Sequence, residues 1–297
     1  MKLSSITFRA AASLAVLMTF ASASLADEIL IHDAKSSPES LSAAPDGSLI
    51  VGSASSPFIY RVKAGSTTAE TFFDASADGP GTFFFGIMVD APNNTVWACE
   101  LTPVPDTKPV VRKSQVRSFD LNTGAPKITW PLPGDSSTCN DFTFGPDHAM
   151  YIADTGNGRI YKMAPGASTA DLFLEHRLLA GIDGITFLDG VMYVNSVFYN
   201  NVYRIPVDAS GKVGNPVDIW MDAPVKGPDG MRAANGKIFV AENGAGKISA
   251  LTITGDTAHV EVVKDGLNTP TAVEPAGDTL WIANRGAGQV VSVPMPK

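Results

Sequence analysis

The sequence predicts an all-β protein: a six-bladed β-propeller with four strands per blade, its ring closed by an N-terminal strand. One strand–turn–strand pattern occurs six times, and its first residues are separated by 46, 55, 43, 46 and 42 positions. Periods of about 40–50 residues built from short strands and turns are typical of propeller blades. Gly and Pro recur at the turns, and no long segment shows a sustained helical period of apolar residues.

Each repeat has a first strand, a turn containing Pro, Asp, Asn or Gly, and an apolar second strand that ends in a small or polar residue. The six units are ESLSAAPDGSLIVGS from Glu39, FGIMVDAPNNTVWACE from Phe85, NDFTFGPDHAMYIAD from Asn140, DGITFLDGVMYVNS from Asp183, DGMRAANGKIFVAE from Asp229 and TAVEPAGDTLWIAN from Thr271. Short strands bounded by such turns predict the two inner strands of every blade.

Two outer strands complete each blade. Third strands are predicted at 58–62, 116–120, 159–163, 202–207, 247–253 and 289–293, and fourth strands at 71–73, 127–130, 172–174, 217–220 and 260–263. An insertion from Pro103 to Lys113 is interpreted as a loop. The sixth unit has no outer strand after it, whereas Glu28 to His32 has that pattern. The N-terminal strand therefore completes the last blade, which also removes two open sheet edges.

Residues 1–26 have the pattern of a secretory signal peptide. Lys2 and Arg9 give a positive start, a short apolar run follows from Ala10 to Phe20, and small residues end it, with cleavage predicted after Ala26 or alternatively Ala23. The apolar run is shorter than the roughly 20 residues of a membrane-spanning helix. We therefore expect residues 27–297 to form one exported propeller domain, periplasmic or extracellular.

The charge excludes two classes of partner. The net charge is −8, and removal of Lys2 and Arg9 with the signal makes it −8 − 2 = −10. An acidic chain without a Lys/Arg cluster does not suit nucleic acid or an anionic membrane.

The two cysteines, Cys99 and Cys139, fall at the channel mouth in neighbouring blades. A disulfide is geometrically plausible there in an oxidising compartment, and two small buried thiols are the alternative.

The first residues of the repeats form a ring at one mouth of the central channel. They are Glu39, Phe85, Asn140, Asp183, Asp229 and Thr271. Three carboxylates that face one another across a narrow channel repel, so the ring requires a cation or retained protons. An all-oxygen donor set suits Ca²⁺, or Mg²⁺ and Mn²⁺. We therefore predict a divalent-cation site of Glu39, Asn140, Asp183 and Asp229. Turn capping by the individual residues is the alternative.

Four short motifs carry a family resemblance. They are Pro38-Glu39, Asn140-Asp141-Phe142, Asp183-Gly184-Ile185 and Pro228-Asp229-Gly230-Met231. Over residues 28–294 the chain resembles the SMP-30/gluconolactonase/luciferin-regenerating group of six-bladed propellers, which includes diisopropylfluorophosphatase-like enzymes. The resemblance implies that the four predicted ligands bind a catalytic cation, usually calcium, in a hydrolase of lactones or related esters. Asp183 stands where the family more often has Asn.

The resemblance also implies roles in catalysis. Asp229 is the predicted general base for an attacking water and Asp183 the second choice, with the cation as Lewis acid. Direct nucleophilic attack by Asp229 is the alternative. Phe83-Phe84-Phe85 stands where sugar-lactone members have polar residues, which favours a less polar lactone or ester substrate. Substrate contacts are assigned to Phe85, Glu100 and Thr271. Second strands end in a further polar series, for which turn capping is the favoured role: Glu100, Asp154, Ser196, Glu242 and Asn284.

Two other function classes stay open. A non-enzymatic, ligand-binding propeller would use its cation only for structure, with the protein filling every coordination position. A metal-free catalyst similar to strictosidine-synthase-like propellers would share the architecture but would not need the four ring ligands. Fold alone does not separate these classes.

Overall fold

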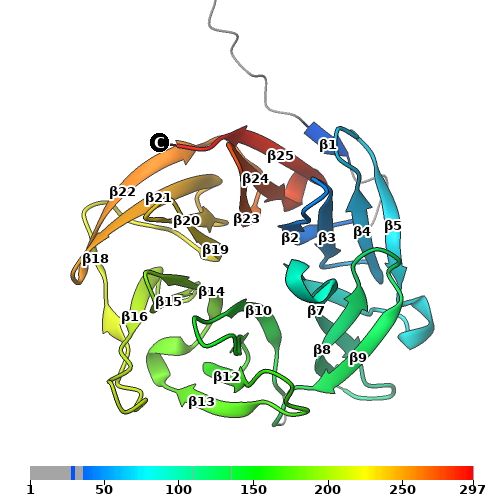
Figure 1. The fold of residues 1–297 in the computed structure, drawn as a ribbon, viewed down its shortest axis with the longest axis horizontal. Coiled ribbons are helices and arrows are strands. Elements are labelled where there is room, and N and C mark those ends of the chain that lie inside the picture. Colours follow the sequence, from blue (N-terminus) through cyan, green and yellow to red (C-terminus); the bar gives the residue numbers. More distant parts are fainter. Residues whose placement is uncertain (1–27, 31–35, 109, 135, 297) are drawn as a thin grey trace, which may run out of the picture.

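The computed structural model describes residues 28–30, 36–108, 110–134 and 136–296. Six small β-sheets surround a central axis like the blades of a propeller (Figure 1), as the repeats predict. In the described residues the helices are four single 3₁₀ turns, at Ser76–Asp78, Ala91–Asn93, Arg177–Leu179 and Arg285–Ala287. None of the described helices has the length and apolar character needed to cross a membrane.

The strands of a blade follow one another outward from the channel. Blade 1 contains β2 Pro38–Ala43, β3 Leu49–Ser53, β4 Phe58–Val62 and β5 Ala69–Asp74; blade 2 contains β6 Phe83–Asp90, β7 Thr95–Pro103, β8 Arg112–Asp120 and β9 Pro126–Pro131; blade 3 contains β10 Cys139–Phe144, β11 Met150–Asp154, β12 Arg159–Met163 and β13 Asp171–Glu175. Blade 4 contains β14 Ile182–Leu188, β15 Val191–Ser196, β16 Asn201–Ile205 and β17 Val217–Asp218; blade 5 contains β19 Pro228–Ala234, β20 Lys237–Glu242, β21 Lys247–Thr254 and β22 Thr257–Lys264; blade 6 contains β23 Pro270–Ala276, β24 Thr279–Asn284 and β25 Gln289–Pro294.

The N-terminal strand closes the ring, as predicted. β1, Glu28–Leu30, pairs antiparallel with β25, with Glu28 opposite Val291. Figure 1 shows β1 beside β25, where the first and last blades of the ring meet. The last two residues of the predicted strand and the predicted signal peptide, residues 1–26, lie outside the described residues.

The predicted outer strand 217–220 is confirmed only for Val217–Asp218, because this segment belongs to two sheets. β17 pairs with β16 in blade 4, whereas β18, Trp220–Met221, runs parallel to β22 of blade 5. Between them the buried Ile219 donates its backbone N–H to the Val202 carbonyl. The chain thus crosses from one blade to the next within four residues, which the sequence pattern shows as one strand.

The insertion in blade 2 is partly strand and only partly loop. β7 and β8 stay paired as far as Pro103 and Arg112, so the predicted loop shrinks to residues 104–111. The β7–β8 hairpin therefore continues three residues beyond Glu100, the last residue of the repeat unit.

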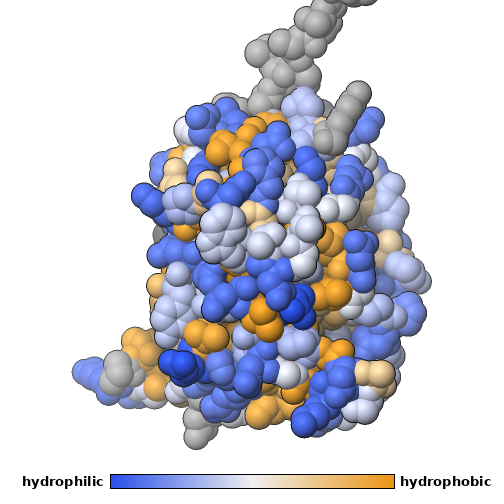
Figure 2. All heavy atoms as spheres, turned by 90° about the vertical axis from the view of Figure 1, so that its left-hand side faces the viewer, coloured by the Kyte–Doolittle hydropathy of each residue, from blue (hydrophilic) through white to orange (hydrophobic). Residues whose placement is uncertain are grey.

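The hydrophobic core consists of layers between neighbouring blades. One layer joins Leu41 and Val51 of blade 1 to Ala272 and Val290 of blade 6, and equivalent layers follow around the ring. First and second strands are almost entirely buried, whereas fourth strands are largely exposed. On the side of the molecule shown in Figure 2, hydrophilic residues are interspersed with small hydrophobic areas. The inner strands are therefore rigidly held where the ring residues occur.

Candidate functional site

Every first strand is irregular at the ring position. In blade 5, Pro228 pairs with Glu242 and Met231 with Val240, so the two residues between them, beginning with Asp229, face a single residue of β20. The same irregularity occurs at the ring residue of all six blades. Bulges re-aim side chains. Five of the six ring residues line one cavity of about 10 Å³ on the channel axis: Glu39, Asn140, Asp183, Asp229 and Thr271.

The residue after each ring position is almost always small, for a steric reason. A Cβ on Gly184 would lie 2.6 Å from the Asp229 carbonyl oxygen, and one on Gly230 would lie 2.7 Å from the Thr271 carbonyl oxygen. Each inner strand thus touches the bulge of the next blade. This close approach explains why both Asp-Gly pairs of the resemblance contain glycine.

The ring side chains are buried and hydrogen-bonded to one another. Asn140 Nδ2 donates to Asp183 Oδ2 at 2.7 Å, and the carboxyl groups of Asp183 and Asp229 share a hydrogen bond. Asp229 also accepts from Gly230 N at 3.0 Å and from Asn243 Nδ2 at 3.1 Å. The three carboxyl groups and Asn140 are only 6–8% exposed. Their charges therefore interact with little solvent screening.

Burial and mutual repulsion raise the pKa values of all three ring carboxyl groups. Burial and then the charge of Asp229 raise the pKa of Glu39 to about 8, against the opposing effect of Arg285. Burial and the charge of Glu39 raise the pKa of Asp183 to about 8. Burial and the charge of Asp183 raise the pKa of Asp229 well above its usual range. Without a cation the ring therefore retains protons at neutral pH.

Two arginines partly balance the carboxylates. Arg285 Nη1 lies 2.9 Å from Glu39 Oε2, and Arg232 makes a two-pronged pair with Asp141 at 2.7 and 3.0 Å. Four carboxyl groups line the cavity or its wall: Glu39, Asp141, Asp183 and Asp229. Glu274 also lies beside Arg232, with its Oε2 3.7 Å from the arginine Nε. When all five carboxyl groups are ionised, the local charge is −5 + 2 = −3, and a single bound dication would offset most of it.

The donor chemistry fits a divalent cation, after two rearrangements. All donors are oxygens, and the cavity has room for about one water-sized particle. Glu39 Oε2 is buried without a well-aligned hydrogen bond, since its contact with Arg285 is an ion pair of poor hydrogen-bond geometry. In the described residues, however, no three His, Cys, Asp or Glu side chains already form a ligand cluster. Binding requires the Asp183–Asp229 hydrogen bond to open and Asn140 to turn its amide oxygen inward.

Of the three predicted substrate contacts, Thr271 alone lines the cavity, and all three make structural interactions. Thr271 is 1% exposed, and its hydroxyl donates to the Glu39 carbonyl at 2.8 Å. Glu100 is fully buried and pairs with Arg117 Nη1 at 2.6 Å. Phe85 occupies the ring register but packs against Phe83, with ring centroids 4.9 Å apart, and does not line the cavity. Their role in binding substrate stays a prediction.

The polar series at the ends of the second strands acts mainly in capping, the role favoured from the sequence. Asp154 accepts from the backbone N–H of Thr138 at 2.7 Å, Glu242 from that of Lys226 at 2.8 Å, and Asn284 from that of Asn268 at 2.8 Å. Each bond fastens the segment that leads into a ring residue. Glu100 departs from this pattern through its pair with Arg117.

A second ring of side chains, which sequence reasoning missed, contacts the first. It comprises the residues directly after the six repeat units: Ala54, Leu101, Thr155, Val197, Asn243 and Arg285. Three of them bond to ring members: Thr155 accepts from Asn140 at 2.9 Å, Asn243 donates to Asp229, and Arg285 pairs with Glu39. Asp141 and Arg232 were also missed. Asp141 carried a visible signal, because the other blades have Gly, Ala or Ser at its position.

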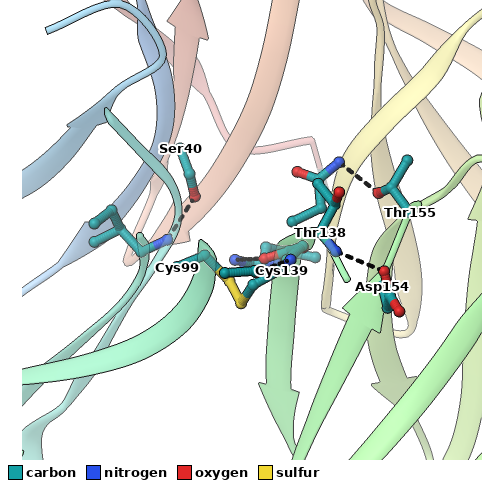
Figure 3. The surroundings of a disulfide bond; sticks show 11 residues. Ser40, Cys99, Thr138, Cys139, Asp154 and Thr155 are labelled. Carbon is teal, nitrogen blue, oxygen red and sulfur yellow. Dashed lines mark hydrogen bonds and ion pairs between the residues drawn. A yellow bond between two sulfur atoms is a disulfide. The ribbon is translucent and has the colours of Figure 1, made fainter. Parts of the chain in front are cut away.

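Cys99 and Cys139 form a disulfide, which decides between the two alternatives left by the sequence. Their Cα atoms are 5.3 Å apart, and the bond joins β7 of blade 2 to β10 of blade 3. Figure 3 shows the bond between Cys99 and Cys139, with Thr138 and the Asp154 carboxylate that accepts from it nearby. Since Cys139 directly precedes Asn140, the disulfide fixes the inner strand that carries one predicted ligand.

The raised pKa values predict that chelator-treated protein loses stability as pH rises. The folded state holds protons on Glu39, Asp183 and Asp229 more tightly than the unfolded chain, so unfolding becomes easier between about pH 4 and about pH 8. Each group contributes at most about 1.4 kcal/mol per pH unit. Urea unfolding at pH 5.5 and pH 8 in EDTA measures the slope. Asp183→Asn should flatten it, and an equally steep slope in that variant would contradict the assignment.

Several solved structures with different activities share this fold. A gluconolactonase from Xanthomonas campestris superposes with a TM-score of 0.69 at 14% identity, covering 91% of this chain and 90% of its own. A virginiamycin B lyase from Staphylococcus aureus gives 0.63 at 15% identity, covering 92% and 99%. A PQQ-bound aldose sugar dehydrogenase from Streptomyces coelicolor gives 0.64 at 17% identity, covering 91% and 98%.

No protein-family model and no curated protein matches the sequence. At the identities of the solved structures the likeness shows the architecture alone. Because the three proteins have three different activities, function must be argued from the site.

Proposed function

We propose that this chain is an exported, divalent-cation-dependent hydrolase of lactones or related esters, similar to the SMP-30/gluconolactonase group. The observation that carries the proposal is the ring itself: three buried carboxyl groups and one amide converge on a cavity the size of one ion. A set of acidic groups that raise one another's pKa values inside a channel marks a candidate functional site. A gluconolactonase among the fold neighbours supports this choice, and the N-terminal pattern supports export.

The ring residues would divide the chemistry between them. Glu39, Asn140, Asp183 and Asp229 would hold the cation, most suitably Ca²⁺ with Mg²⁺ or Mn²⁺ as alternatives. When bound, the cation would supply Lewis-acid polarisation of the substrate carbonyl. Asp229 holds its proton tightly in the cation-free ring and would be ionised once positive charge enters. It could then accept the proton of the attacking water as general base.

The surroundings of the ring support a substrate of moderate polarity. Phe83 and Phe85 form a partly exposed aromatic pair on β6, and the guanidinium of Arg112 lies 5.3 Å above the Phe83 ring. Gly86, next to this pair, lines the cavity. Aliphatic or aryl lactones and esters suit such a surface better than a polyhydroxylated sugar lactone.

A binding propeller with a structural cation is the second candidate, favoured by one observation. The cavity of about 10 Å³ accommodates an ion but no substrate beside it. In that function the protein would fill the coordination positions, and no turnover would depend on the ring.

Assays on a substrate panel distinguish these functions. Aliphatic lactones, aryl esters and aldonolactones would be assayed after EDTA treatment and again with Ca²⁺ restored. We expect hydrolysis of the less polar substrates, lost in EDTA and recovered with Ca²⁺. Hydrolysis unaffected by EDTA would contradict cation dependence, and absence of turnover across the panel with a bound cation would favour the binding propeller.

A further inference from the structure

A second cavity lies between blades 2 and 3, at the end of the propeller opposite the ring. Its volume is about 600 Å³, within the range of roughly 300–1,000 Å³ that is typical of small-molecule sites. Asp90 and Phe144, which line it, end β6 and β10, whereas the ring residues stand near the starts of these strands. The two cavities share no residue. We call this second cavity the blade 2–3 slot.

The walls of the blade 2–3 slot are aromatic and apolar. Trp97 and Trp130 come from β7 and β9 and stack with their rings 5.1 Å apart and 19° from parallel. Phe144, Met150 and Met163 form the facing wall from blade 3. Methionine side chains adapt to different ligand shapes, and tryptophan faces attract cations.

One carboxylate gives the slot its charge. Asp90 is the only Asp, Glu, Lys or Arg among the lining residues. Its Oδ2 accepts from Asn93 Nδ2 at 2.9 Å and from Trp97 Nε1 at 3.4 Å, which fixes the carboxylate beside the tryptophan pair. No described residue donates a hydrogen bond to its Oδ1. A partly exposed carboxylate next to stacked indoles matches a positively charged ligand with an apolar body.

The equivalent slot between blades 6 and 1 can be compared with the blade 2–3 slot. Trp281 occupies the position in blade 6 that Trp97 occupies in blade 2, and it lines the equivalent slot between blades 6 and 1. That slot has a volume of only about 200 Å³ and is lined by Lys63, with no carboxylate and no second tryptophan. The large volume, the paired indoles and the negative charge are therefore specific to the blade 2–3 slot and are absent from the equivalent slot between blades 6 and 1.

We infer that the blade 2–3 slot binds a small organic cation, an ammonium group carried on an aromatic or apolar body. The ammonium group lies against the Trp97–Trp130 pair and Asp90, and the apolar body fills the space beside Met150 and Met163. This binding site is separate from the ring and does not depend on the proposed hydrolase activity.

The test uses benzyltrimethylammonium as the probe and isothermal titration as the measurement, at pH 8 with excess Ca²⁺ so that the ring does not attract the probe. One equivalent should bind, and benzyl alcohol should bind more weakly. Asp90→Asn should weaken probe binding about fivefold and leave benzyl alcohol binding unchanged. Trp130→Ala should weaken probe binding about tenfold through loss of the cation–aromatic contact.

Trp281→Ala is the matched control, since it removes the equivalent tryptophan from the other slot and should leave probe binding unchanged. Thermal melts establish that each variant is folded. Absence of probe binding to the wild-type protein overturns the inference. Equal affinity for probe and benzyl alcohol, or equal losses in Trp281→Ala and Trp130→Ala, also overturns it.

Discussion

Asp229→Asn is expected to lower hydrolysis of the best substrate by about 10²–10⁴-fold, because it removes the proton acceptor and keeps the shape. The variant retains an oxygen that can accept from Gly230 N. In the wild-type protein Asn243 Nδ2 donates to Asp229 Oδ2. The variant has an amide nitrogen at that place, so Asn243 must turn its amide oxygen toward it. Cation affinity should therefore fall much less than turnover.

Asp183→Asn is the matched variant one blade away. It introduces the residue more usual in the SMP-30/gluconolactonase group that the sequence resembles, and it should retain substantial activity. With one repelling charge removed, Asp229 should ionise at lower pH, so the acid limb of the pH–rate profile should shift toward lower pH. Wild-type turnover by Asp229→Asn, measured with saturating Ca²⁺, would refute its role as base.

Cys99→Ala/Cys139→Ala is expected to lower the free energy of unfolding by about 4 kcal/mol. The bond closes a loop with a sequence separation of 40 residues, and the loss follows from the greater conformational entropy of the unfolded chain. Urea unfolding of the wild-type protein, with and without dithiothreitol, and of the double variant measures it. A wild-type stability that dithiothreitol leaves unchanged would contradict this expectation.

The disulfide should also affect the ring. Cys139 lies between Thr138 and Asn140 at the start of β10. Loss of the bond should loosen this strand and weaken Ca²⁺ binding modestly, whereas the fold of distant blades should persist. Free-thiol titration provides the control, with no thiols expected before reduction and two after it.

The architecture could be predicted because a propeller repeats its local pattern. Strands and turns recur with one spacing, and the missing outer strand of the last repeat indicated closure by β1. The partial failure at 217–220 has a physical cause. Val217 and Trp220 belong to one short β-type run, and no local signal records that the chain changes sheet at the buried Ile219.

The positions of the ring residues could be predicted for the same reason, but their partners could not. Register places Asp183 and Asp229 at equivalent points, whereas the pairing of Arg285 with Glu39 joins residues from opposite ends of the chain. A repeat pattern also does not predict the direction in which a side chain points. Thr271 has the ring register, yet its hydroxyl turns to a backbone carbonyl.

Calcium titration of chelator-treated protein at pH 8 tests the proposed cation site most directly. We expect one ion per chain, bound with release of protons because the ring carboxyl groups have raised pKa values. At about 100-fold above the dissociation constant, Ca²⁺ should add about 2.7 kcal/mol to the free energy of unfolding. The titration is repeated in buffers of different ionisation enthalpy, so that released protons give a heat in at least one of them. A cation site would be contradicted if no buffer gave a heat of binding and if the melting midpoints in EDTA and in excess Ca²⁺ were equal.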